Sequence, residues 1–147
     1  MFDNQGTYNT ATVVNVTAGN TTANINAQLS NAGSIGGRVT DSSGNGIPNV
    51  DISVCDIYGN GLAWGSTDSN GDYTIGSIPS GYQKVQFWPW NAGNYIPEWY
   101  DDQASFEQAD SVLVVAGETT TGIDAQLANS GAISGRVTNS TGTMAPE

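Results

Sequence analysis

The sequence predicts an all-β fold of the sandwich type, and three observations lead to this prediction. Nineteen glycines among 147 residues, together with abundant Asn, Thr and Ser, describe short strands separated by many turns. No long stretch carries the charge pattern of a surface helix. Alternation of apolar and polar residues recurs in short segments between turn residues, which is typical of half-buried strands.

Seven such segments follow one another within one unit of the chain, and seven strands suit a sandwich. The intervening turns are rich in Asn and Gly, which tolerate the positive φ that tight turns require. The predicted strands span residues 35–40, 50–55, 62–67, 73–78, 82–88, 111–115 and 121–127.

Alternation also assigns the two faces of each strand. Val54 and Phe87 are expected to face the core with their apolar neighbours two residues away. Lys84 and Gln86 then point the other way, and Cys55 lies off the apolar face. Cys55 is the only cysteine, so an intrachain disulfide is excluded, and an inert thiol is expected because no cation or histidine is near it in sequence.

The chain is similar to itself at an offset of 98 residues. Residues 27–40 (AQLSNAGSIGGRVT) match residues 125–138 (AQLANSGAISGRVT), and the register continues without a gap across the whole overlap. Roughly half of the overlapping positions are identical, which indicates tandem repeats. We therefore expect the C-terminal part of one repeat at 1–31, a complete repeat at 32–131 and the first strand of a following repeat at 132–147.

Charge and composition exclude several classes of function. Three Lys and Arg residues against 14 Asp and Glu give a net charge of −11, which would repel nucleic acid. The sequence has no histidine, so it lacks the usual general base and transition-metal ligand, and we expect no enzyme and no cofactor. No apolar run is long enough to span a bilayer, and no signal-peptide pattern is present.

Four motifs in order resemble one known family. They are IGGRVTD at 35–41, GIPNVDISV at 46–54, STDSNGDYTI at 66–75 and IPSGYQKVQF at 78–87, and they are similar to the carboxypeptidase regulatory-like domain. The resemblance implies a transthyretin-like, Ig-like, seven-stranded Greek-key sandwich that serves as an accessory module without catalytic residues. The segment YIPEWYDDQ at 95–103 resembles the tandem version found on secreted and surface proteins of bacteria and archaea.

Related collagen-adhesin B-type domains form an internal isopeptide bond from a buried lysine. The present sequence departs from them, because its first strand carries Arg38 and alternation predicts an exposed Lys84. An exposed amine keeps its charge, so we expect no such bond.

Alternating oxygen ligands mark a candidate calcium site. Asp68, Asn70 and Asp72 offer oxygens at every second position, and Asp101 and Asp102 add two carboxylates. The loop lacks the remaining spacing of an EF-hand, and the same residues are typical of a hydrogen-bonded β-turn. We favour the turn over a metal site.

Five aromatic residues cluster within a dozen positions, namely Trp88, Trp90, Tyr95, Trp99 and Tyr100. Exposed aromatic platforms of this kind stack on sugars, which makes the cluster a candidate polysaccharide site. Large aromatic side chains also cover the open end of a sandwich as part of the core, which is the default interpretation.

Asn15, Asn20 and Asn139 begin acceptor sequons for N-glycosylation. All three lie in the flanking partial repeats, and the short motif arises often in chains rich in Asn and Thr.

The repeat leads to the functional hypothesis. Only about five residues join the last strand of one unit to the first strand of the next, so the modules should form a stiff rod. We expect a structural or adhesive module on the cell surface or outside the cell, with neighbouring repeats or copies of itself as partners. A carbohydrate-binding accessory module remains the alternative.

Overall fold

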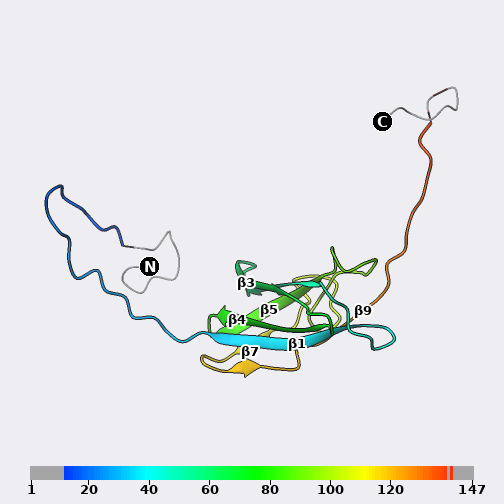
Figure 1. Ribbon diagram of the computed structural model, residues 1–147, viewed down its shortest axis with the longest axis horizontal. Helices are drawn as coiled ribbons and strands as arrows, with labels where there is room; N and C mark the ends of the chain where they lie inside the picture. The colour runs from blue at the N-terminus through cyan, green and yellow to red at the C-terminus, as the bar shows by residue number, and fades with distance from the viewer. Residues whose placement is uncertain (1–11, 139, 141–147) are drawn as a thin grey trace.

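The computed structural model describes residues 12–138 and 140, and its folded part is a β-sandwich of two layers (Figure 1). The described residues contain no helix. The strands are β1 (Gly33–Asp41), β2 (Asp51–Asp56), β3 (Gly61–Ser66), β4 (Asp72–Ile78), β5 (Gly81–Trp88), β6 (Glu98–Trp99), β7 (Val112–Val114), β8 (Thr119–Thr120) and β9 (Ala125–Leu127).

The two sheets are built differently. In the first sheet, β1 lies in the middle, pairs antiparallel with β4 on one side and pairs parallel with β8 and β9 on the other. In the second sheet, the order is β3-β2-β5-β6, and β7 also pairs with β5; all of these pairs are antiparallel. The all-β sandwich predicted from the sequence is confirmed.

Two details of the predicted strand order differ in the structure. Of the predicted strand 121–127, only Ala125–Leu127 forms a strand, β9; β8 lies just before the predicted range, and Gly122, with a φ of 78°, lies between the two. The two-residue strand β6 was not expected, because the segment around it is too short to show alternation.

The core lies between the two sheets and consists of the residues that alternation placed there. Val39 of β1, Val54 of β2 and Phe87 of β5 are all completely buried. Each side chain of this size contributes about 1.5–3 kcal/mol to folding when it leaves water. The ring of Tyr73 on β4 meets that of Phe87 edge to face at 6.1 Å, which joins the two layers.

Close backbone approach between β1 and the segment before β9 requires a glycine. A Cβ atom on Gly37 would overlap with the carbonyl oxygen of Ile123. The same carbonyl accepts a hydrogen bond of 2.6 Å from the Tyr73 hydroxyl. Gly135, which matches Gly37 in the repeat, is also a glycine.

The chain enters and leaves the sandwich at opposite ends (Figure 1). This follows from the parallel pairing, because the chain enters through the start of β1 and leaves through the end of β9, where Leu127 pairs with Asp41. The folded part, from β1 to β9, lies within the predicted complete unit 32–131.

The flanking segments are extended and expose apolar side chains. Val16 and Ile133 have exposed fractions of 71% and 104%, whereas their counterparts in the repeat, Val114 and Ile35, have 1% and 0%. The same apolar positions are therefore buried where the rest of a unit is present.

Candidate functional site

The outer face of the second sheet carries a row of polar and aromatic side chains. Residues directly opposite in an antiparallel pair point to the same face. Ser53 on β2 pairs with Trp64 on one side and with Gln86 on the other, and Asp51 pairs with Trp88. All five side chains lie on the face opposite to the core.

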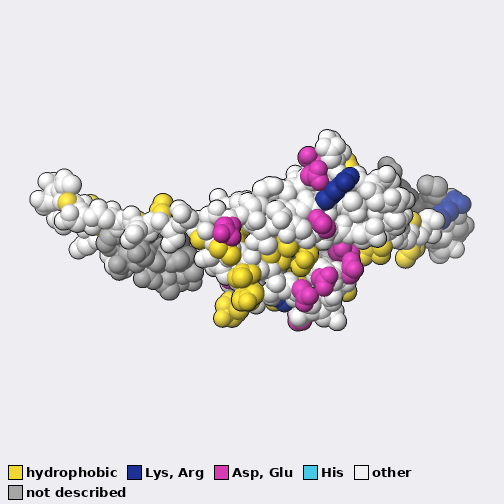
Figure 2. Space-filling view, turned by 90° about the horizontal axis from the view of Figure 1, so that it is seen from below, with side chains coloured by type: hydrophobic (Ala, Val, Ile, Leu, Met, Phe, Trp, Pro, Cys, Tyr) yellow, Lys and Arg dark blue, Asp and Glu magenta, His cyan; other side chains and the backbone are white. Residues whose placement is uncertain are grey.

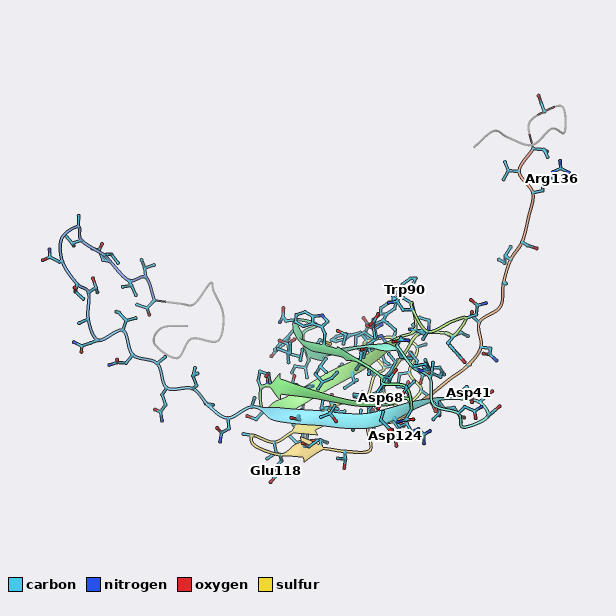
Figure 3. The ribbon with its side chains drawn as sticks, viewed as in Figure 1. Asp41, Asp68, Trp90, Glu118, Asp124 and Arg136 are labelled. Carbon is cyan, nitrogen blue, oxygen red and sulfur yellow. The ribbon has the colours of Figure 1, made fainter. Side chains whose placement is uncertain are left out.

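Trp88 and Trp90 form a stacked pair at the edge of this face. Their ring centres are 5.6 Å apart and their planes differ by 9°. Trp88 is half-buried, whereas 78% of Trp90 is exposed. Figure 3 shows Trp90 projecting from the side of the sandwich opposite to β1. One aromatic surface is thus held rigid by its neighbour and open to solvent.

Two hollows share these indoles as walls. One hollow, of about 290 Å³, is completed by the loop after β5 and by the segment after β9, through residues such as Tyr95 and Ser130. The other hollow, of about 370 Å³, extends over β2 and β3, where Asp51, Ser53 and Trp64 line it. The stacked pair therefore contributes to a surface that continues across the sheet.

Trp64 was missed in the sequence, although 75% of it is exposed. A signal was present, because alternation in 62–67 places Trp64 on the opposite face to Ala63, which is buried. Trp64 extends the exposed aromatic surface of Trp88 and Trp90, and contiguous exposed apolar patches mark interaction sites.

The structure divides the five aromatic residues predicted as a sugar platform. Trp88, Trp90 and Tyr95 come together at the first hollow, and Tyr95 also packs against the hydrophobic core. Trp99 instead meets the ring of Phe106 edge to face at 5.3 Å, and Tyr100 packs against the hydrophobic core.

Lys84 is buried, and the prediction that it is exposed was wrong. It does point away from the core, but the segment after β6 covers it there: its exposed fraction is 9%, and its ammonium nitrogen lies 4.4 Å from the centre of the Phe106 ring. The Nζ atom donates a hydrogen bond to the backbone carbonyl of Phe106. Neither partner is the side-chain amide or carboxyl group that an isopeptide bond requires.

Cys55 lies opposite Lys84 in the pairing of β2 with β5 and is buried. Burial raises the pKa of its thiol, and the neighbouring Asp56 carboxylate raises it further. The thiol therefore stays protonated at neutral pH and is a poor nucleophile.

The predicted calcium residues Asp68, Asn70 and Asp72 form a hydrogen-bonded turn. Asp68 Oδ1 accepts hydrogen bonds from the backbone amides of Asn70, at 2.7 Å, and Asp72, at 3.0 Å. The Asp72 carboxylate lies 3.8 Å from Nε of Arg38. The Asp68 and Asp72 carboxylates therefore already have partners within the protein.

The same turn design occurs twice more in the sandwich, after β1 and after β2. Asp41 and Asp56 each accept amide hydrogen bonds from the residues two and four positions later. Each also accepts a side-chain hydrogen bond from an Asn four positions later, Asn45 and Asn60, and this bond is the main reason why the pKa of each aspartate is lowered.

Asp101 and Asp102 lie elsewhere, in a hollow of about 260 Å³ that Asp124 also lines. Figure 2 shows acidic side chains gathered on the face of the sandwich seen there. A hydrogen bond with the Asp110 carboxyl raises the pKa of Asp101. Across residues 12–138 and 140, no three His, Cys, Asp or Glu side chains are grouped so that they could hold a metal ion.

Two of the three glycosylation candidates lie outside the sandwich. Asn15 and Asn20 are exposed in the extended segment before β1. Asn139 lies outside the described residues.

Comparison with known families assigns the fold. The profile of the carboxypeptidase regulatory-like domain matches residues 34–128, which cover β1 to β9 almost completely. This chain belongs to the carboxypeptidase regulatory-like domain family. The resemblance of the four motifs is thereby confirmed, and no curated protein sequence matches the chain significantly.

Parts of several solved structures are similar to this carboxypeptidase regulatory-like domain at low sequence identity. The Bacillus anthracis TIE protein superposes with a TM-score of 0.51 and 15% identity, over 67% of this chain and 17% of that one. A minor pilin of Streptococcus agalactiae superposes with a TM-score of 0.45 and 13% identity, over 75% of this chain and 49% of the pilin. A protein from Bacteroides uniformis described as a putative carbohydrate binding protein superposes with a TM-score of 0.44 and 18% identity. The match covers 64% of this chain and 40% of that protein. The chain thus spans about half or less of each of these proteins.

Among the residues that the structure describes, no helix could cross a membrane.

Proposed function

We propose that this chain is a non-catalytic structural module of an extracellular or cell-surface repeat protein, in which successive modules build a stiff stalk or filament. The observation that carries the proposal is the opposite placement of the chain's two connections to the sandwich, which follows from the parallel pairing of β1 with β9. Units joined at opposite ends extend a chain in one direction.

The segment after β9 supports a stiff connection. The Ala128 carbonyl accepts a hydrogen bond of 2.9 Å from the amide of Ile96, and the Ser130 amide donates one of 2.8 Å to the carbonyl of Asn94. In the 98-residue register, the next residue, Gly131, matches Gly33, where β1 begins. No free linker then separates the anchored segment from the start of a following unit.

Open strand edges support lateral contacts between modules or copies. β3 and β4 lie at the ends of their sheets, so one side of each strand has unpaired backbone groups. Such edges can pair with a strand from another chain.

The test is a chain of three consecutive 98-residue units. Small-angle scattering should show a maximum dimension that increases by a constant length per unit. A matched variant with a Gly-Ser linker inserted between Ser130 and Gly131 should become more compact on average. If the two chains give the same broad distribution of dimensions, the stiff-rod proposal fails.

A second candidate function is carbohydrate binding, which the aromatic outer face favours. Trp64 and Trp90 are both more than 70% exposed, although a tryptophan is costly to leave in water. Aromatic rings held open on a rigid sheet are suited to stacking on sugar rings.

A further inference from the structure

We infer that the two hollows beside Trp88 and Trp90 form one site for an uncharged polysaccharide, which crosses from β3 over the stacked indoles to the segment after β9. This inference rests on the second proposed function, carbohydrate binding, and names its substrate class and its extent.

The two hollows form one continuous site because they share two of their lining residues. Trp88 and Trp90 line both hollows, Trp64 lies at the far side of one, and Tyr95 lies at the far side of the other. A chain of sugar rings lying on the sheet would therefore meet aromatic surface at each step. The hollow volumes of about 290 and 370 Å³ lie at the low end of the range for small-ligand sites, which suits rings that rest on the surface.

The charged residues around the two hollows indicate that the ligand is uncharged. Among the residues that the structure describes, no Lys or Arg lines either hollow, and Asp51 is the only carboxylate that does. Lys84 is buried under Phe106, and Arg38 faces Asp72. With a net charge of −11 over the whole sequence, the protein would repel uronic-acid or sulfated polymers.

Polar groups for sugar hydroxyls are spread along the same path. The Asp51 carboxylate, which lines the second hollow, accepts a hydrogen bond of 3.3 Å from the Asn91 amide, and this bond orients it. Ser53 lines that hollow too, whereas Asn94 and Ser130 line the first. Hydroxyl-rich ligands need such a mixture of donors and acceptors beside aromatic faces.

Ile133, the next large apolar side chain after Ser130, is a poor alternative to a ligand in these hollows because it has another role. Ile133 follows Ser130 closely, but it matches Ile35 in the repeat, and Ile35 is completely buried in its own sandwich. In a following unit, Ile133 is needed for that unit's core.

The experiment measures binding of the whole chain to soluble polymers by affinity electrophoresis and calorimetry. The uncharged probes are hydroxyethylcellulose, glucomannan, xylan and amylose; polygalacturonate is the acidic probe and chitosan the cationic one. Trp90→Ala tests the centre that the two hollows share, Trp64→Ala tests the end over β3, and Tyr95→Leu tests the end beside the segment after β9. Tyr58→Ala is the control, because Tyr58 is 81% exposed and lines neither hollow.

We expect saturable binding to at least one uncharged polymer and none to polygalacturonate. Each tryptophan variant and Tyr95→Leu should lose about tenfold in affinity, whereas the Tyr58 variant should keep it. Unchanged far-UV circular dichroism would show that the variants fold.

The possible failures are distinguishable. If Trp90→Ala weakens binding but either Trp64→Ala or Tyr95→Leu does not, the site is confined to one hollow, and the inference fails while carbohydrate binding stands. Tighter binding of polygalacturonate or chitosan than of every uncharged polymer would overturn the substrate class alone. If the wild type binds no polymer, both fail, and concentration-dependent self-association lost in Trp90→Ala would assign the face to a second copy of the chain.

Discussion

The Lys84 ammonium group donates a hydrogen bond to the backbone carbonyl of Phe106 and lies against the face of the same residue's ring. One side chain thus holds the segment after β6 onto the outer face of β5. A charge in this position is satisfied by a carbonyl dipole and an aromatic face.

Lys84→Ala should lower the free energy of unfolding by about 1–3 kcal/mol, because it leaves the Phe106 carbonyl without its donor and removes the cation from the ring. Urea unfolding measures the change. Gln86→Ala is the matched control on the same strand and face, and it should cost less than about 0.5 kcal/mol. Equal losses in the two variants would contradict the role given to the ammonium group.

Glu98→Gln should flatten the pH dependence of stability. Burial, and then the charge of Asp102, raises the pKa of Glu98 to about 7 from its usual 4.5. The folded state therefore keeps a proton that the unfolded state releases, so this contribution to stability is complete below pH 4.5 and is lost as the pH rises through 7.

Melting temperatures of wild type and Glu98→Gln between pH 4 and pH 8 check this. The melting temperature of the variant relative to that of the wild type should increase as the pH rises. Glu118→Gln, which removes an exposed carboxylate just before β8, should run parallel to the wild type. A constant difference between wild type and Glu98→Gln would rule out the titration of Glu98 as the cause.

Gly37→Ala should destabilise the sandwich by about 3 kcal/mol, because the new methyl group would overlap with the Ile123 carbonyl and push the segment before β9 away from β1. Gly76→Ala is the control in β4. Its added carbon would have the Ser34 hydroxyl, at 3.4 Å, as its nearest neighbour, so the change should be close to neutral. Thermal unfolding of both variants decides, and similar losses would disprove the close approach at Gly37.

Thr67→Val should cost about 1–3 kcal/mol although the two side chains have nearly the same shape. The buried Thr67 hydroxyl donates to the Ile47 carbonyl at 2.7 Å and accepts from the Val50 amide at 2.9 Å. Thr67→Ser keeps the hydroxyl and should restore most of the lost stability in chemical denaturation. A Thr67→Val variant as stable as the wild type would show that the two hydrogen bonds of the hydroxyl do not contribute to stability.

Much of the fold could be predicted because it depends on local patterns. Alternation placed Val54 and Phe87 in the core, and the turn at Asp68 is read from adjacent residues. Lys84 shows the limit of this reasoning, because alternation gives the face of a strand but not what covers that face. Phe106, which covers it, is 22 residues away and outside any regular element.

The candidate site was predictable in its aromatic residues but not in its shape. Trp88 and Trp90 stand out in the sequence, whereas the hollows beside them arise where Trp64 from β3 and Ser130 from the segment after β9 come close. Trp64 closes one hollow and Ser130 closes the other, so each hollow joins distant parts of the chain. Which residues meet there depends on the register between strands, which one sequence does not specify.

The parallel pairing of β1 with β9 also determines how the module would respond to tension. A pull on the two ends of the chain draws β1 toward one end of the sandwich and β9 toward the other, along their shared axis. The hydrogen bonds between the two strands are then loaded in shear and must yield together, whereas a strand peeled from its end would lose them one at a time. Stretching therefore acts on the part of the ladder best arranged to resist it.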